Sequence, residues 1–141
     1  MTLKNTDNEY RITVSNRQTI DSETDTIEET AYGNYTEKNG KQYITYKTEN
    51  DGDKISSMIK IDGNEILIKR TGSVNSSMTY KVDTKKEFLY HLPYGTVPME
   101  IETQRIVSKL DENGGTIELV YTLTVQDEKY FNDMKITVIK R

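Results

Sequence analysis

Residues 90–103 read Tyr-His-Leu-Pro-Tyr-Gly-Thr-Val-Pro-Met-Glu-Ile-Glu-Thr and contain both prolines and the single histidine of the chain. Pro93 fixes its own φ angle and favours an extended residue before it, and Gly95 adopts a positive φ at no steric cost. Pro93-Tyr94-Gly95 therefore predicts a tight turn. From this turn to Thr103, apolar and polar residues alternate with a period of two, which predicts a strand with one buried and one exposed face.

Alternation of the same kind recurs along the rest of the chain, between short turn signals. Asn39-Gly40 is the strongest of these signals, because Asn-Gly favours the two-residue turn of a β-hairpin. The acidic stretch 21–25 also predicts a turn. The alternating segments span approximately residues 10–20, 26–36, 42–49, 55–61, 66–70, 74–82, 87–92, 96–103, 117–125 and 134–138.

Two positions interrupt the alternation and predict curvature of the sheet. Gly33 stands inside the long second segment, where a glycine indicates a kink or bulge of the kind that lets a sheet curl into a barrel. After Thr103 the alternation loses its phase, which predicts a bulge or a short helical turn between Gln104 and Lys109.

The predicted fold class is all-β, with eight to ten antiparallel strands and no convincing amphipathic helix. Short loops make sequential strands pair, and a long up-and-down meander hides its edges best by closing into a barrel. We therefore expect residues 1–141 to form one antiparallel up-and-down β-barrel domain, with a two-sheet sandwich as the alternative. A chain of 141 residues is long enough to bury one real core.

The composition argues against several classes of function. The chain has 19 basic and 23 acidic residues, a net charge of −4 and no long basic run, so we expect no nucleic-acid partner. No stretch approaches the roughly 20 apolar residues that span a bilayer, and residues 1–7 lack the apolar segment of a signal peptide. The absence of cysteine excludes disulfides, thiolate metal sites and cysteine nucleophiles. We expect a cytoplasmic protein without cofactor, metal or membrane partner, and the sequence leaves its oligomeric state open.

Several short motifs follow one another in order along nearly the whole chain. They are Arg70-x-Gly72, Met78, Tyr90-x-x-Pro93-Tyr94-Gly95, Met99-x-x-x-Thr103, Gly114-Gly115 and Tyr121, preceded by Gly33-x-Tyr35 and Tyr43-x-x-Tyr46. In order and spacing this set resembles the YwiB-like family of small proteins from Gram-positive bacteria. The resemblance implies a calycin-like or lipocalin-like β-barrel and no established activity, substrate or catalytic residue. Lys47 and Thr48 depart from the more acidic character expected after Tyr46, so no role of charge at that rim is carried over.

Arg70 follows Ile66 and Ile68 on the inward phase of its predicted strand. A buried charge without a partner is not tolerated, so an inward guanidinium needs an anion. One hypothesis is that Arg70 binds the carboxylate or phosphate of a ligand, for which a guanidinium offers bidentate geometry. The alternatives are that Arg70 pairs with an internal glutamate, that it closes one end of the barrel, or that the strand phase is misassigned.

Three tyrosines are candidates for ligand contact, because tyrosine combines an apolar ring with a polar tip. The alternative is that these tyrosines only fill the core and cover the sheet. Thr103 continues the apolar phase of its strand and, together with Arg105, extends a polar lining unless the strand leaves the barrel there. The predicted ligand-binding residues are Arg70, Tyr90, Tyr94, Thr103 and Tyr121.

No catalytic or metal-binding motif stands out in the sequence. His91 has no second histidine to share a metal with, and a histidine base needs a partner, so we expect an exposed strand histidine. Glu100 and Glu102 lie on the exposed phase of their strand, where water surrounds them, so we do not expect them to act as a catalytic pair.

We therefore expect a protein that binds a small amphipathic or anionic ligand, in the barrel or at its mouth, without catalysing a reaction. The alternative is a protein-interaction module with a solid barrel core and a functional outer face or rim. An enzyme would require a cluster of titratable groups in a cleft, and the sequence does not indicate one.

Overall fold

The computed structural model describes residues 9–141, and these residues form ten β-strands and no helix. The prediction that residues 1–7 lack the apolar segment of a signal peptide concerns residues outside the described part. The strands are β1 (Tyr10–Ile20), β2 (Glu23–Lys38), β3 (Lys41–Asn50), β4 (Asp53–Asp62), β5 (Glu65–Gly72), β6 (Ser76–Lys81), β7 (Lys85–Leu92), β8 (Gly95–Asp111), β9 (Gly114–Val125) and β10 (Glu128–Lys140).

Hydrogen bonds join the ten strands into one antiparallel sheet with the order β6-β5-β4-β3-β2-β1-β10-β9-β8-β7. With one exception, strands that are consecutive in sequence are hydrogen-bonded to each other, and the first strand is hydrogen-bonded to the last. The exception is β6 and β7, which form the two edges of the sheet. This corrects the expectation that every sequential pair would be hydrogen-bonded.

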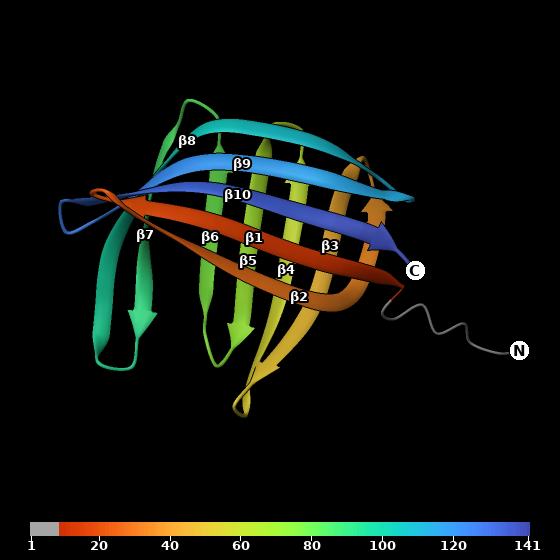
Figure 1. Cartoon of the computed structure of the whole chain (residues 1–141), viewed down its shortest axis with the longest axis horizontal. Helices are drawn as coiled ribbons and strands as arrows, with labels where there is room; N and C mark the ends of the chain where they lie inside the picture. The colour runs from red at the N-terminus through yellow and green to blue at the C-terminus, as the bar shows by residue number, and fades with distance from the viewer. Residues whose placement is uncertain (1–8) are drawn as a thin grey trace, which may run out of the picture.

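The two edges meet at the segment that joins them. Val82 forms a parallel bridge with Thr103 of β8, and the backbone N–H of Asp83 donates to the carbonyl oxygen of Thr103 at 3.1 Å. The N–H of Thr103 in turn donates to the carbonyl oxygen of Thr84 at 3.4 Å. The sheet is therefore a nearly closed barrel, in which β1, β8, β9 and β10 cross β3–β6 at a steep angle (Figure 1). The predicted all-β barrel of eight to ten strands is confirmed, and the two-sheet sandwich is wrong.

Gly33 marks the place where β2 changes partners. It pairs with Tyr10 of β1 and with Tyr46 of β3, and β2 follows β1 before this point and β3 after it. A Cβ atom at Gly33 would collide with the carbonyl oxygen of Thr45 and come within 2.9 Å of Ile12 Cδ1. The missing side chain thus lets three strands approach closely at the bend, as the kink predicted at this glycine requires.

A β-bulge at Gln104 accounts for the loss of phase in β8. The register of β8 with β9 shifts between Thr103 and Arg105, so Gln104 has no partner of its own. Thr103 therefore points inward, Arg105 is exposed, and Ile106 returns to the inward side. The predicted bulge is confirmed, whereas the idea that Arg105 extends a polar lining is wrong because the extra residue turns it outward.

The tight turns agree with the sequence prediction in part. Asn39 and Gly40 have φ angles of 55° and 78°, which the two-residue hairpin turn needs. The acidic stretch 21–25 is not one loop, because Asp21, with φ at 55°, turns the chain together with Ser22 and β2 begins at once. The remaining acidic residues of that stretch alternate along an exposed strand.

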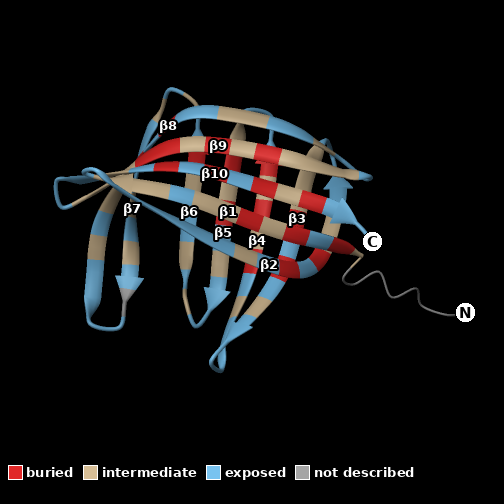
Figure 2. Ribbon diagram, in the orientation of Figure 1, coloured by how far each residue is buried: buried red, intermediate tan, exposed pale blue. Residues whose placement is uncertain are grey.

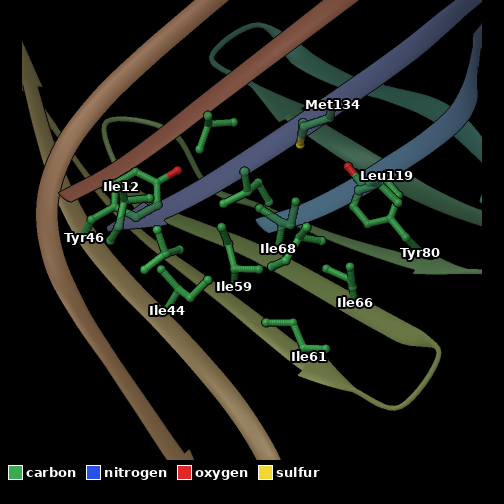
Figure 3. Packing of buried hydrophobic residues seen from close by; sticks show 14 of the residues in the cluster. Ile12, Ile44, Tyr46, Ile59, Ile61, Ile66, Ile68, Tyr80, Leu119 and Met134 are labelled. Atoms are coloured by element: carbon green, nitrogen blue, oxygen red, sulfur yellow. The ribbon is translucent and has the colours of Figure 1, made fainter. Parts of the chain in front are cut away.

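The inward faces of the strands form one apolar core, dominated by isoleucine, that lies where the two halves of the sheet cross (Figures 2 and 3). Burying one such side chain stabilises a fold by roughly 1.5–3 kcal/mol, so this layer supplies the main driving force. The following apolar side chains are at most 2% exposed: Ile12, Ile44, Ile59, Ile66, Ile68, Ile101, Ile117, Leu119, Ile136 and Val138.

Candidate functional site

One layer of inward side chains in β3–β6 is polar, and the layer next to it is apolar. The polar layer lies on the side of the β3–β4 turn, so hydrophilic groups gather at that end of the barrel. In register order the polar layer contains Tyr46, Ser57, Arg70 and Ser76, and the apolar layer contains Ile44, Ile59, Ile68 and Met78.

Arg70 is half-buried in this polar layer. Burial raises the pKa of Tyr46 and Tyr121 and raises the pKa of Tyr80 well above its ordinary value, while the Arg70 guanidinium acts in the opposite direction on all three. The guanidinium therefore lies among tyrosines from β3, β6 and β9. Within residues 9–141 the Arg70 side chain has no ion pair with a carboxylate, so the alternative of an internal glutamate partner finds no support.

The tyrosines around Arg70 are fixed by contacts within the protein. The Tyr46 hydroxyl donates to Glu29 Oε1 at 3.2 Å, and Tyr46 pairs across the ladder with Ser57. The rings of Tyr80 and Tyr121 meet edge to face with centroids 4.7 Å apart, and the Tyr80 hydroxyl donates to Met78 Sδ at 3.3 Å. The polar layer thus combines tyrosine and serine hydroxyl groups with one guanidinium and, through Tyr46, with the carboxylate of Glu29.

A second polar layer lies on the opposite strands. The side-chain amides of Asn16 and Gln18 donate to Asn132 Oδ1 at 3.0 and 2.9 Å, and Asn132 is 2% exposed. Two buried oxygens, Asn16 Oδ1 and Thr103 Oγ1, have no hydrogen-bond partner in the described part of the chain. Asn16 and Gln18 lie on the same face of β1 as the apolar residues before them. Their side-chain amides therefore join a hydrogen-bond network with the buried Asn132.

The structure brings together three of the five predicted ligand-binding residues. Tyr121 lies close enough to Arg70 for the guanidinium charge to lower the pKa of its hydroxyl. Tyr121 also pairs across the ladder with Thr103, which is 1% exposed. Tyr90 is half-buried on the β7–β8 hairpin. Tyr94 is 86% exposed at the tip of that hairpin, because Pro93 and Tyr94 form the turn itself, and the structure does not place it with the others.

Sequence reasoning missed the residues that complete the polar layer. Glu29 stands on the inward phase of β2, together with Ala31, and that position was visible in the sequence. Tyr46, Ser57 and Tyr80 also lie on apolar phases of their strands. Their meeting with Arg70 depends on the register between strands, which the alternation within one strand does not contain.

The candidates for catalysis lie apart from this layer. His91 is exposed on β7, as expected. Glu102 is exposed and pairs across the ladder with Lys85, and Glu100 pairs with Glu87. Among residues 9–141 no group of three or more histidine, aspartate or glutamate side chains is arranged to hold a metal ion.

Two hollows in the surface lie outside the predicted site. A groove of about 730 Å³ lies along β3, β4 and β5 beside the bend in β2, and its lining includes Tyr46 and Ser57 of the polar layer. A second hollow, of about 520 Å³, lies where Tyr10 and Tyr35 face Leu110, Asp111 and Glu112. None of the five predicted ligand-binding residues lines either hollow.

Fold and site together define a small antiparallel β-barrel with a polar end around an arginine. The chain belongs to the family described as a domain of unknown function, DUF1934, whose model matches residues 12–138. It is 30% identical over 118 residues to the uncharacterized β-barrel protein YwiB of Bacillus subtilis (strain 168), which covers 83% of each chain. The crystal structure of the YwiB protein from Bacillus subtilis matches with a TM-score of 0.86 and 26% identity, over 94% of this chain and 91% of that one. The resemblance to the YwiB-like family is therefore confirmed.

Within residues 9–141 the protein contains no helix that is long and apolar enough to cross a membrane.

Proposed function

We propose that the protein binds a small amphipathic or anionic molecule at the mouth of the barrel, and that Arg70 contacts the anionic group of that molecule. One observation carries the proposal: a half-buried guanidinium faces the barrel interior and has no carboxylate partner in residues 9–141. Removing a cation from water is costly unless an anion compensates for it. A bound carboxylate or phosphate compensates with two parallel hydrogen bonds.

The packing of the core favours the mouth over the deep interior. Ile59 and Ile68, in the layer next to Arg70, are each 1% exposed, so the apolar half of the barrel is filled by side chains. Outside the polar layer, apolar surface is available: Ile27 stands on the inward phase of β2 but is 66% exposed, and Phe88 and Tyr90 are half-buried on β7. These side chains suit the apolar part of a ligand whose charged end reaches Arg70.

Calorimetric titration with dodecanoate and with dodecanol tests the proposal, because the two probes share a chain and differ in charge. We expect the wild-type protein to bind dodecanoate more tightly than dodecanol. Loss of a charged hydrogen bond costs about 1.5–3 kcal/mol, so we expect Arg70→Met to weaken dodecanoate binding about ten- to a hundredfold. Binding of dodecanol should change little in this variant.

Arg105→Met is the matched control, since Arg105 lies on the same barrel but points outward. This variant should bind both probes as the wild type does. Equal affinity for the two probes, or equal losses in the Arg70 and Arg105 variants, would contradict the proposal. Native mass spectrometry of freshly purified protein adds a second test, in which a retained small molecule supports tight binding and a clean apo mass argues against it.

The protein-interaction module predicted as the alternative has its own support in the filled core. If the interior holds no ligand, function lies on the outer face or the rim. The calorimetric experiment separates the two functions, because an interaction module has no reason to lose probe binding through Arg70.

A further inference from the structure

Two buried oxygen atoms of the polar interior have no hydrogen-bond partner within residues 9–141. They are Thr103 Oγ1 on β8 and Asn16 Oδ1 on β1. Leaving a buried polar group unpaired costs free energy, so native proteins pair nearly all of them and each exception needs a cause. An amide oxygen only accepts a hydrogen bond, whereas a threonine hydroxyl both donates and accepts. A hydroxyl group is therefore a partner that suits both positions.

The polar side chains around these two oxygens are already paired with the protein. Asn132 is 2% exposed, and its side-chain N–H donates to the carbonyl oxygen of Tyr130 at 2.9 Å. Its Oδ1 accepts from Asn16 and from Gln18. The amide network of β1 and β10 is thus engaged, and it leaves unpaired acceptors at its β1 end and on β8.

Thr103 is placed to meet the ligand proposed above. It is 1% exposed and pairs across the ladder with Tyr121, which lies near the Arg70 guanidinium. Cross-strand partners have their Cβ atoms about 4.5–5.5 Å apart. A ligand group that contacts Thr103 is therefore close to the group that Arg70 binds.

We propose that the ligand carries a hydroxyl group close to its anionic group, and that Thr103 is the residue that recognises this hydroxyl. The ligand class is then a hydroxylated amphipathic acid, with its acid on Arg70 and its hydroxyl on Thr103 Oγ1. Asn16 Oδ1 offers an acceptor to a further hydroxyl on the β1 side. This inference rests on the proposed function, since the anionic group at Arg70 sets the position of the hydroxyl.

The seam of the barrel gives the ligand a route to the buried hydroxyl of Thr103. β6 and β7 are not hydrogen-bonded to each other, and the Val82–Thr84 segment joins β8 at Thr103. The N–H of Thr103 donates to the carbonyl oxygen of Thr84 at 3.4 Å, which is long for a hydrogen bond. Movement of this segment opens the way to Thr103 without separating two paired strands.

Calorimetric titration with dodecanoate and with each enantiomer of 3-hydroxydodecanoate tests the inference. The three probes share a chain and a charge, and the two enantiomers also share their hydrophobicity. We expect the wild-type protein to bind one enantiomer about tenfold more tightly than dodecanoate and than the other enantiomer. Thr103→Val keeps the shape of the side chain without its hydroxyl, so both ratios should fall below about threefold.

Thr122→Val is the matched control, because Thr122 is also buried, but its hydroxyl donates to Gln104 Oε1 at 3.5 Å. This variant should keep the wild-type ratios and melt at a lower temperature than the wild type. Thr103→Val should melt at or above the wild-type temperature, because it loses no hydrogen bond within the protein.

Three outcomes would overturn the inference. A lower melting temperature of Thr103→Val would show that its hydroxyl is already paired, as with an ordered water only. Equal affinity for the three probes, or ratios that fall equally in the two valine variants, would remove the hydroxyl from recognition and leave the anionic site in place. Wild-type protein that does not bind dodecanoate or either hydroxylated probe would contradict the proposed function itself.

Discussion

At the scale of single residues, Arg70 is the position where the proposed function makes its clearest prediction about stability. Tyrosines from three strands lie near its guanidinium, which forms no ion pair with a carboxylate in residues 9–141. A methionine of similar length would fill the same space without a charge. If Arg70 binds the anionic group of a ligand and does not stabilise the fold, replacing it should not destabilise the protein.

We therefore expect Arg70→Met to leave the free energy of unfolding unchanged or to raise it by about 1–2 kcal/mol. Urea unfolding followed by circular dichroism measures the change, and exposed Arg105→Met is the reference for a surface substitution. A loss of several kcal/mol in the Arg70 variant would show that the arginine holds the barrel together, contrary to the proposed role.

The buried tyrosines make a prediction about alkaline pH. Burial, followed by the neighbouring Tyr121, raises the pKa of Tyr80 well above its ordinary value of about 10. The folded protein therefore keeps a proton that the unfolded chain loses above about pH 10, so stability is full below that pH and falls as the pH rises further. We expect Tyr80→Phe to make this fall less steep.

Urea unfolding at a series of pH values from 8 upward measures that slope. At neutral pH the same variant should lose about 1 kcal/mol, because the Tyr80 hydroxyl donates to Met78 Sδ at 3.3 Å. Tyr94→Phe, at the exposed hairpin tip, should keep the wild-type slope. An unchanged slope in Tyr80→Phe would contradict the assignment of the alkaline loss to this buried hydroxyl.

At the scale of elements, the bulge in β8 decides which residues face the core. Ile101 and Thr103 are inward at odd positions, whereas Ile106 is inward at an even position, and Gln104 is the extra residue that reconciles them. Removing a residue from a strand normally turns every following side chain to the other face. Removing the bulged residue itself leaves the following side chains on the faces that they already occupy.

Two deletions in β8 should therefore behave differently. Deletion of Gln104 keeps Ile106 inward and should cost about 1–2 kcal/mol of stability through lost curvature. Deletion of Val107 directs exposed Lys109 inward and Leu110, which packs against the core, outward, and it should cost more than about 4 kcal/mol or prevent folding. Thermal and urea unfolding compare the two variants, and equal losses would contradict the bulge as the origin of the phase change.

Most strands could be predicted from the sequence because each carries its own alternation. Asn39-Gly40 fixed one turn through backbone chemistry, and Gly33 indicated the bend through its missing side chain. The length of β2 could not be predicted, since the acidic residues after Asp21 carry turn-like chemistry that pairing with β1 overrides. In residues 23–25, hydrogen bonding to β1 therefore outweighs the local preference of acidic residues for a turn.

At the scale of the whole molecule, closure of the barrel depends on contacts that no single segment contains. β1 pairs with β10, and the seam lies between β6 and β7, where the Val82–Thr84 segment reaches Thr103. The candidate site depends on the same closure, because it brings Tyr121 of β9 near Arg70 of β5. Sequence alternation predicted that Arg70 points inward, but the tyrosines it meets follow from register and curvature.

The most direct test of the account is the side-chain Nε–Hε signal of Arg70 in an NMR titration with dodecanoate. We predict that this signal and the backbone amides of Thr103 and Tyr121 shift together and saturate, while the Nε–Hε signal of Arg105 stays in place. Saturable binding that leaves the Arg70 signal unmoved, or no binding at all, would contradict a ligand held by Arg70 at the mouth of the barrel.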